Sequence, residues 1–289
     1  MPTPTLLRLA GALLALLGFA LTAPEAHVAA PAQDPAATSA DEELTNLLAA
    51  EGIHLDRASG AVALRAQVLV TNELLEYLLV TRRGATHESL LMTEITPSLL
   101  NAALFALGLE PGTNMGFSPA ADGESELVLP AGDGVLPYVA WQEAGELYVY
   151  RVEDVLCDLA AERSMRRHRW VFLGSGFKTY TAERGEEFVA DVEGNLINLA
   201  FFSEGSTLAT SALPECLDQT IWGANDWLLP PRGEEVLLIL ATERLDGVPA
   251  GLRAHLPTPA RARVELPDPD AFGPGAPLDG GVDAGGSGG

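Results

Sequence analysis

The segment RRGATHESLLMTE, residues 82–94, contains a histidine, a carboxylate and a hydroxyl in succession: His87, Glu88 and Ser89. An imidazole titrates near neutral pH, and a neighbouring carboxylate can hold a proton or orient a water, as general acid–base catalysis requires. In a strand, however, adjacent side chains point to opposite faces, so His87 would share a face with Ser89 and not with Glu88. The segment therefore favours a hydrogen-bonded loop or the edge of a binding face, with His-dependent hydrolysis as the alternative.

A metal site needs several ligands that converge. The histidines show no H-x-x-x-H or H-x-H spacing, so a zinc site would require distant partners such as Glu76 or Asp191. The alternation of Asp191, Glu193 and Asn195 resembles a calcium loop, but Gly194 is misplaced for an EF-hand and no bidentate acid follows at the required spacing. The pattern favours a tight hairpin turn instead. Whether a metal binds stays open, and no cofactor is predicted.

Two further motifs favour structural roles. The sequence GSGF, residues 174–177 with Ser175, follows an expected strand but lacks the lysine and the helix of a phosphate-binding loop, so it predicts a strand-ending turn. The four tryptophans are scarce large residues, and we expect most of them, including Trp141 and Trp170, to anchor the core. Trp222 and Trp227 flank the sequence GAND and could line a groove.

The charge excludes some partners. The 289 residues include 17 basic and 40 acidic side chains, for a formal charge of −23, which repels phosphate backbones and anionic lipid. The basic run at 163–169 could hold an anion but is more typical of a solvated face. We therefore expect no nucleic-acid partner, and an unknown protein or small-molecule ligand of the cell envelope.

The two ends differ in composition from the middle. Residues 1–26 combine one arginine, a short apolar run and small residues, which predicts a signal peptide and an exported protein, periplasmic or secreted. An Ala/Pro-rich linker at 27–40 and a Pro/Gly-rich disordered tail at 246–289 flank a folded part at 41–245, which could divide into subdomains near 50–115 and 125–242. No later segment is apolar and long enough to span a membrane.

The cysteines leave two possibilities open. Cys157 and Cys216 can close a disulfide in an oxidising compartment, or both can remain buried thiols. Two widely separated cysteines do not supply the four thiolates that an iron–sulfur cluster normally takes.

Hydrophobic periodicity predicts the elements of the folded part. We expect helices at 41–51, 96–107 and 152–165, and strands at 53–57, 61–70, 76–81, 89–93, 136–141, 146–152, 169–175 and 234–241, with two more strands in 186–202 joined by a turn at 192–195. Together they predict an α+β fold, a mostly antiparallel sheet with two or three helices packed on one side and disordered ends.

The order of these motifs resembles a known family. Residues 76–112, a tryptophan region, WVFLGSGF at 170–177 and FVADVEGNLINLAFF at 188–202 are similar to the YdjY-type domain of exported bacterial proteins, over about residues 50–242. The resemblance marks these positions: Glu76, His87, Glu88, Ser89, Trp141, Trp170, Gly174, Ser175, Asp191, Gly194 and Asn195. No catalytic role comes with them. Some members carry a ferredoxin-like label, which the cysteine count argues against here.

The resemblance and the motifs together predict an exported, non-enzymatic binding or envelope-associated module. One alternative is a metal- or His-dependent hydrolase centred on His87 and Glu88. Another is a redox partner that shares a cofactor with a second protein.

Overall fold

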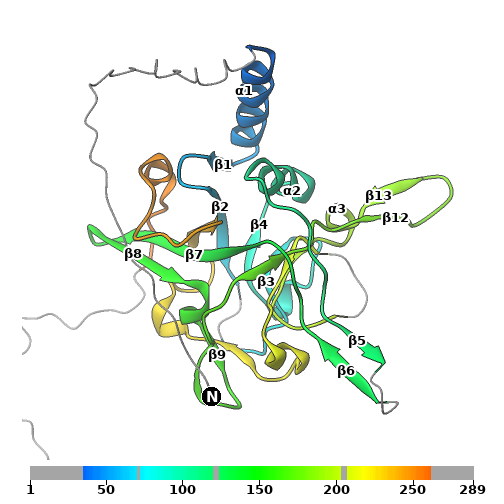
Figure 1. The fold of residues 1–289 in the computed structure, drawn as a ribbon. Coiled ribbons are helices and arrows are strands. Elements are labelled where there is room, and N and C mark those ends of the chain that lie inside the picture. The colour runs from blue at the N-terminus through cyan, green and yellow to red at the C-terminus, as the bar shows by residue number, and fades with distance from the viewer. Residues whose placement is uncertain (1–34, 70–71, 120–123, 203–206, 262–289) are drawn as a thin grey trace, which may run out of the picture. The chain divides into compact units, whose positions relative to one another are not determined.

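The computed structural model describes residues 35–69, 72–119, 124–202 and 207–261 (Figure 1). The chain divides into two units, Met1–Ala40 and Asp41–Gly289, and the features discussed below belong to the second. The predicted signal peptide lies outside the described residues. Helix α1 (Pro35–Ala50) begins within the predicted linker, and its Leu48 is fully buried. Gly52, at φ +78°, lies in a turn just after the helix.

The main sheet closes into an eight-stranded barrel. Its strands, in spatial order, are β2 (Ala61–Val68), β17 (Glu235–Ala241), β7 (Gly134–Glu143), β11 (Trp170–Phe172), β15 (Ala209–Thr210), β14 (Asn195–Asn198), β3 (Tyr77–Thr81) and β4 (Ser89–Thr93), which pairs with β2 again. The pairs β3–β4 and β14–β15 are parallel, and the others are antiparallel. Strands β1 (Ile53–Asp56) and β8 (Glu146–Arg151) extend the sheet from β2 and β7.

The predicted α+β sheet with helices on one side is therefore wrong. The strands were placed correctly for the most part, but β4 returns to β2, and this pairing closes the sheet on itself. Once the sheet is closed, the apolar side chains of its inner face pack against one another. The same core also includes Leu48 of α1 and the buried face of α2 (Pro97–Ala106).

Strand β17 shows how both faces of the barrel wall are covered. Val236, Leu238 and Leu240 belong to the main core, whereas Leu237 and Ile239 belong to a second apolar cluster on the opposite face. The second cluster is completed by Val248 and Leu252, from the segment that follows β17 and contains the 3₁₀ helix η5 (Ala250–His255). Packed structure therefore continues beyond the expected boundary at residue 245.

Helix α2 (Pro97–Ala106) confirms the clearest of the predicted helices. Pro97 occupies the first turn, and Leu100, Ala103 and Leu104 are its buried face. Thr96, which precedes the helix, makes no side-chain capping bond.

Two local predictions are wrong. The expected helix at 152–165 is instead η2 (Val152–Val155), β9 (Leu156–Asp158) and β10 (Arg163–Ser164), with β9 between β10 and β16 (Trp222–Ala224). The expected turn at 192–195 is replaced by α3 (Val189–Glu193), which separates β13 (Glu186–Phe188) from β14. Gly194, at φ +77°, ends α3 in the left-handed conformation that glycine adopts at low cost.

Short elements complete the described chain. They are η1 (Thr86–Glu88), the two-stranded ribbon of β5 (Gly116–Pro119) and β6 (Ser125–Val128), β12 (Phe177–Thr179) paired with β13, η3 (Pro214–Leu217) and η4 (Asp226–Leu228). None of the helices in the described segments is both long and apolar enough to cross a membrane.

Candidate functional site

The predicted residues Asp191, in α3, and Asn195, at the start of β14, each hold a neighbouring segment by a hydrogen bond. The Asp191 Oδ1 accepts a hydrogen bond from the backbone N–H of Ser98, at 2.8 Å, and so caps the first turn of α2 from outside. Asn195 Oδ1 accepts the N–H of Ala85, at 3.0 Å, in the loop before η1. A Cβ at Gly84 would lie 2.5 Å from the same Oδ1, so the loop approaches too closely for any other residue. Both side chains therefore act as scaffold.

His87 and Glu88 lie in η1, where the strand alternation assumed from the sequence does not hold. Their side chains face each other, with His87 Nε2 3.5 Å from Glu88 Oε2. The His87 side chain is 78% exposed, whereas Ser89 is fully buried and donates its hydroxyl to the carbonyl of Ala85. The prediction that His87 shares a face with Ser89 is wrong, and this serine has no access to a substrate.

Glu76 joins Glu88 to form a carboxyl pair. The backbone N–H of Glu76 donates to the Glu88 carbonyl at 2.8 Å, which brings the start of β3 beside η1. Burial raises the pKa of Glu76, and the charge of Glu88 and a hydrogen bond between the two carboxyls raise it further. Burial and then the Glu76 and Glu88 carboxylates raise the pKa of Tyr77 to about 12. Glu76 therefore takes up a proton more readily than an ordinary glutamate.

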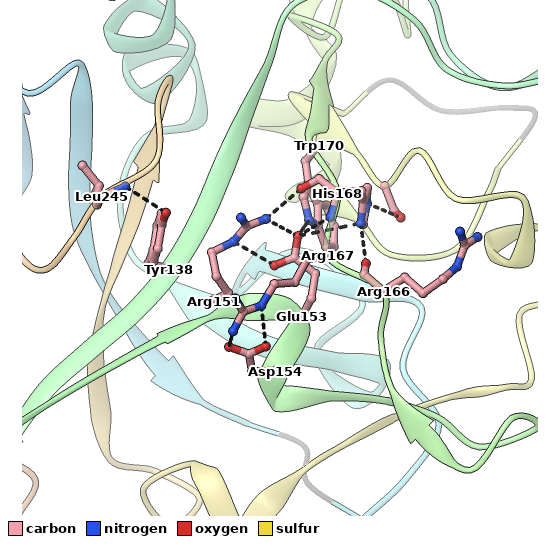
Figure 2. Close-up of polar contacts among 10 residues, drawn as sticks. Tyr138, Arg151, Glu153, Asp154, Arg166, Arg167, His168, Trp170 and Leu245 are labelled. Atoms are coloured by element: carbon pink, nitrogen blue, oxygen red, sulfur yellow. Dashed lines mark hydrogen bonds and ion pairs between the residues drawn. The ribbon is translucent and has the colours of Figure 1, made fainter.

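Trp170, on β11, belongs to a different cluster of polar contacts (Figure 2). Its Nε1 donates to Glu153 Oε1 at 3.1 Å. Glu153 is fully buried and also accepts from Arg151 Nε at 3.0 Å, from Arg151 Nη2, and from the N–H of His168 at 3.3 Å. Both carboxylate oxygens are satisfied and the charge is paired, as a buried carboxylate requires.

His168 continues this cluster through a chain of hydrogen bonds. Its Nδ1 lies 3.0 Å from the carbonyl oxygen of Arg166, and its Nε2 lies 2.9 Å from Ser211 Oγ, which accepts from Cys216 Sγ at 3.0 Å. Burial lowers the pKa of His168, so the neutral ring donates from Nδ1 and accepts the Ser211 hydroxyl at Nε2. The pairing resembles a nucleophile and its base, but Ser211 and Cys216 are each 1% exposed. The arrangement braces the core.

The cysteines are two free thiols. The disulfide between Cys157 and Cys216, one of the two alternatives that the sequence left open, is therefore not formed. Burial raises the pKa of the Cys216 thiol to about 12, and burial also raises the pKa of Cys157.

The basic run at 163–169 is largely neutralised by acids. Arg166 makes a forked ion pair with Glu215, and Arg167 makes one with Asp154. Arg169 donates to the carbonyls of Gly134 and Thr242, at 2.8 and 2.6 Å.

The remaining predicted residues have structural surroundings. Trp141 and Trp222 are buried, so Trp222 does not line a surface groove, whereas Trp227 is 71% exposed. Ser175, at φ +56°, accepts the N–H of Ala190 at 3.3 Å and lies in a turn after β11. Among the described residues, no group of three or more His, Cys, Asp or Glu side chains is arranged to hold a metal ion.

A groove that the sequence did not predict opens on the barrel wall; we call it the seam groove. Strand β17 pairs along one edge of β2, while β1 and β4 share the other edge. The β1 pairing reaches Leu64 and the β4 pairing begins at Gln67, so the two strands diverge beside Arg65 and Ala66. The Thr93 hydroxyl satisfies the Arg65 carbonyl across this gap, at 3.0 Å.

The seam groove has a volume of about 580 Å³ and a polar lining. Arg65 pairs with Glu235 at 3.0 Å, and Arg82 pairs with Glu94 at 2.5 Å. All four of these side chains are about half exposed or more, from 49% to 75%.

Two stacked imidazoles form another part of the seam groove lining. The rings of His54, on β1, and His255, in η5, lie 3.3 Å apart at an angle of 10°. Burial, then the charges of His255 and Arg65, lower the pKa of His54 to about 4. Burial and Arg65 lower the pKa of His255 as well. Both rings are therefore neutral at pH 7, and the segment after β17 closes against β1 through them.

Comparison with known proteins identifies a family over this region. The sequence model of the YdjY domain matches residues 53–241, from the first residue of β1 to the last residue of β17. Neither a curated protein nor a solved structure matches the chain.

Proposed function

Because the chain belongs to the YdjY domain family, we propose that it is an exported, non-enzymatic binding module whose ligand lies in the seam groove. The observation that carries this proposal is the groove itself, a hollow of about 580 Å³ formed where β1 and β4 diverge from β2. Its volume is in the range of small-molecule sites, roughly 300–1,000 Å³.

The charges of the groove favour a ligand that carries both signs. An exposed ion pair contributes roughly 0–1 kcal/mol, so the pairs Arg65–Glu235 and Arg82–Glu94 can be opened at little cost. A ligand carboxylate can then take the place of the glutamate beside an arginine, while its ammonium pairs with the released glutamate. Free amino acids and short peptides have this combination of charges. We therefore propose such a zwitterion as the ligand class.

Titration calorimetry tests this proposal on the chain from residue 27 onward. The probes are a set of free dipeptides and the same dipeptides with acetylated amino ends and amidated carboxyl ends. We expect the free forms to bind and Arg65→Gln to weaken binding about tenfold, the size of one charge-assisted hydrogen bond. Arg184→Gln is the matched control, because Arg184 is 54% exposed and pairs with Glu187 outside the groove. Equal binding of blocked and free dipeptides would exclude the zwitterion.

Export is the part of the proposal that rests on residues 1–26. Fractionation of cells that produce the full chain tests it. We expect a shortened mature form in the periplasm or the medium, and retention in the cytoplasm after replacement of apolar residues in 9–21 by charged ones. A full-length cytoplasmic product from the unaltered chain would contradict export.

A second candidate function is favoured by the carboxyl pair at η1. The raised pKa of Glu76 beside Glu88 and the exposed His87 are the materials of acid–base hydrolysis. A screen of ester, amide and glycoside substrates tests this reading. Turnover that is lost in both His87→Ala and Glu88→Gln but kept in Arg65→Gln would replace the binding module with a hydrolase.

A further inference from the structure

We propose that a second hollow, separate from the seam groove, binds a small carboxylate with a short apolar group. It has a volume of about 470 Å³ and is formed by β7, β8, η2 and the segment after β17. Three arginines line it: Arg151, Arg167 and Arg244. We call it the arginine hollow.

Two of the arginines are oriented in advance by carboxylates (Figure 2). Arg151 uses Nε and Nη2 to bind Glu153, and Arg167 uses Nε and Nη2 to bind Asp154 at 2.9 and 2.7 Å. In the described part of the chain, neither Nη1 has a hydrogen-bond partner. Each guanidinium is thus fixed and retains donors for a ligand, which reduces the ordering cost of binding an anion.

Arg244 and Tyr138 add further donors. Arg244 is exposed and has no hydrogen bond or ion pair with any described residue. The Tyr138 hydroxyl accepts the N–H of Leu245 at 3.0 Å, which leaves its own O–H free to donate. Tyr138 is 5% exposed, and the Arg151 guanidinium lies 5.4 Å from its ring centroid. The phenol is therefore held firmly at the side of the hollow.

The charges of the hollow disfavour a ligand with more than one negative charge. Glu153 offsets Arg151 and Asp154 offsets Arg167, so Arg244 is the guanidinium that has no carboxylate partner among the described residues. Asp246 also lines the hollow and opposes a highly charged ligand. A carboxylate therefore suits the site better than a doubly charged phosphate.

The rest of the lining is apolar. Leu147, Val149 and Leu245 line the hollow, and the Leu147 side chain is 44% exposed in the free protein. An apolar group on the ligand can cover these side chains and gain by leaving water. The fixed guanidinium donors suit a carboxylate, and the aliphatic side chains suit an apolar group attached to it.

Benzoate is the probe for the test, followed by NMR through the arginine Nε–Hε signals of the chain from residue 27. We expect saturable shifts of the Arg151 and Arg167 signals with a Kd of about 1 mM, the affinity that ligand efficiency allows for a ligand of this size. Benzamide, the neutral analogue, should not bind, and inorganic phosphate should bind more weakly than benzoate. Shifts that do not saturate by about 50 mM benzoate, or equal shifts with benzamide, would overturn the proposal.

Two surface variants give opposite expected results. Arg244→Gln should weaken benzoate binding about tenfold because it removes the unpaired charge. Asp246→Asn should tighten binding severalfold because it removes a repulsion. Both residues are exposed, so the fold should be kept, and an unchanged melting temperature checks this. The same affinity in both variants would refute the assignment. Because the seam groove has other lining residues, either result leaves the dipeptide test unaffected.

Discussion

Replacement of Glu153 by glutamine tests the buried cluster most directly. The substitution keeps the shape of the side chain but leaves the Arg151 guanidinium, 13% exposed, without its counter-charge. Loss of one partner from a buried ion pair costs about 3–5 kcal/mol. That is a large share of the roughly 5–15 kcal/mol that keeps a domain folded. We therefore expect Glu153→Gln to unfold at a much lower urea concentration than the unaltered protein.

The double variant Arg151→Met/Glu153→Gln separates charge from packing. It removes the unpaired guanidinium, while the glutamine oxygen can still accept from Trp170 Nε1. We expect it to recover most of the loss, so that it lies within about 2 kcal/mol of the unaltered protein. The exposed pair Arg82–Glu94 serves as the control, since Glu94→Gln should cost less than about 1 kcal/mol.

Urea unfolding at pH 7, followed by far-ultraviolet circular dichroism, gives the free energy of unfolding for each variant. A cost for Glu153→Gln below about 1 kcal/mol would refute the reasoning, because a buried charge would then have lost its partner at no penalty. A double variant as unstable as the single one would show that the cluster acts through shape and hydrogen bonds, with little contribution from charge.

Three further outcomes follow from the structure. The pKa of His54 is lowered to about 4, below that of an unfolded imidazole. Its contribution to stability is therefore complete above about pH 6.5 and is lost as the pH falls through about 4. In His54→Phe, the urea midpoint of unfolding should change less with pH over this range. Asp191→Ala removes the external cap of α2 and should cost about 1 kcal/mol by the same unfolding measurement, whereas Asp191→Asn should keep most of it. Iodoacetamide at pH 8 should leave Cys216 unmodified, because burial raises the pKa of its thiol to about 12. The less buried Cys157 should react slowly. Equal labelling of the two cysteines in the folded protein would contradict the burial of Cys216.

Local patterns predicted most of the strands but not their closure. The strands expected at 53–57, 61–70 and 89–93 and the helix expected at 96–107 follow from hydrophobic periodicity. The closure depends on β4 meeting β2 beside Gln67, a pairing of residues that are distant in sequence. Alternation within one strand contains no information about which strand is its neighbour, so an open sheet was an equally good reading.

The helix predicted at 152–165 failed for a different reason. Its apolar spacing fits a helix, but Glu153 and Asp158 are buried, and they accept hydrogen bonds that a helix surface would not offer. Tertiary contacts determined the local structure against the periodic signal. The turn expected at 192–195 also failed, because Gly194 ends a helix there and does not join two strands.

The sequence identified some of the residues that the structure brings together. Glu76, His87 and Glu88 do lie side by side, because η1 follows directly on the loop fastened by Asn195. The cluster around Glu153 was missed apart from Trp170, since its members come from separate strands and loops. The seam groove was missed as well, because it arises from the divergence of β1 and β4, which no single stretch of residues records.

The segment that packs on the outer face of β17 extends beyond the end of the family match, so the boundary of the match and the boundary of the folded structure differ. Sequence similarity ends at residue 241, but Val248 and Leu252 shield an apolar surface formed partly by Leu237 and Ile239. The cover is secured further on, where the Pro257 carbonyl accepts the N–H of Gln142 at 2.9 Å. A chain that ended at residue 241 would expose the apolar side chains of Leu237 and Ile239 on β17 to water. Exposed apolar surfaces of this kind promote aggregation. The folded unit is therefore longer than the segment that the family model matches.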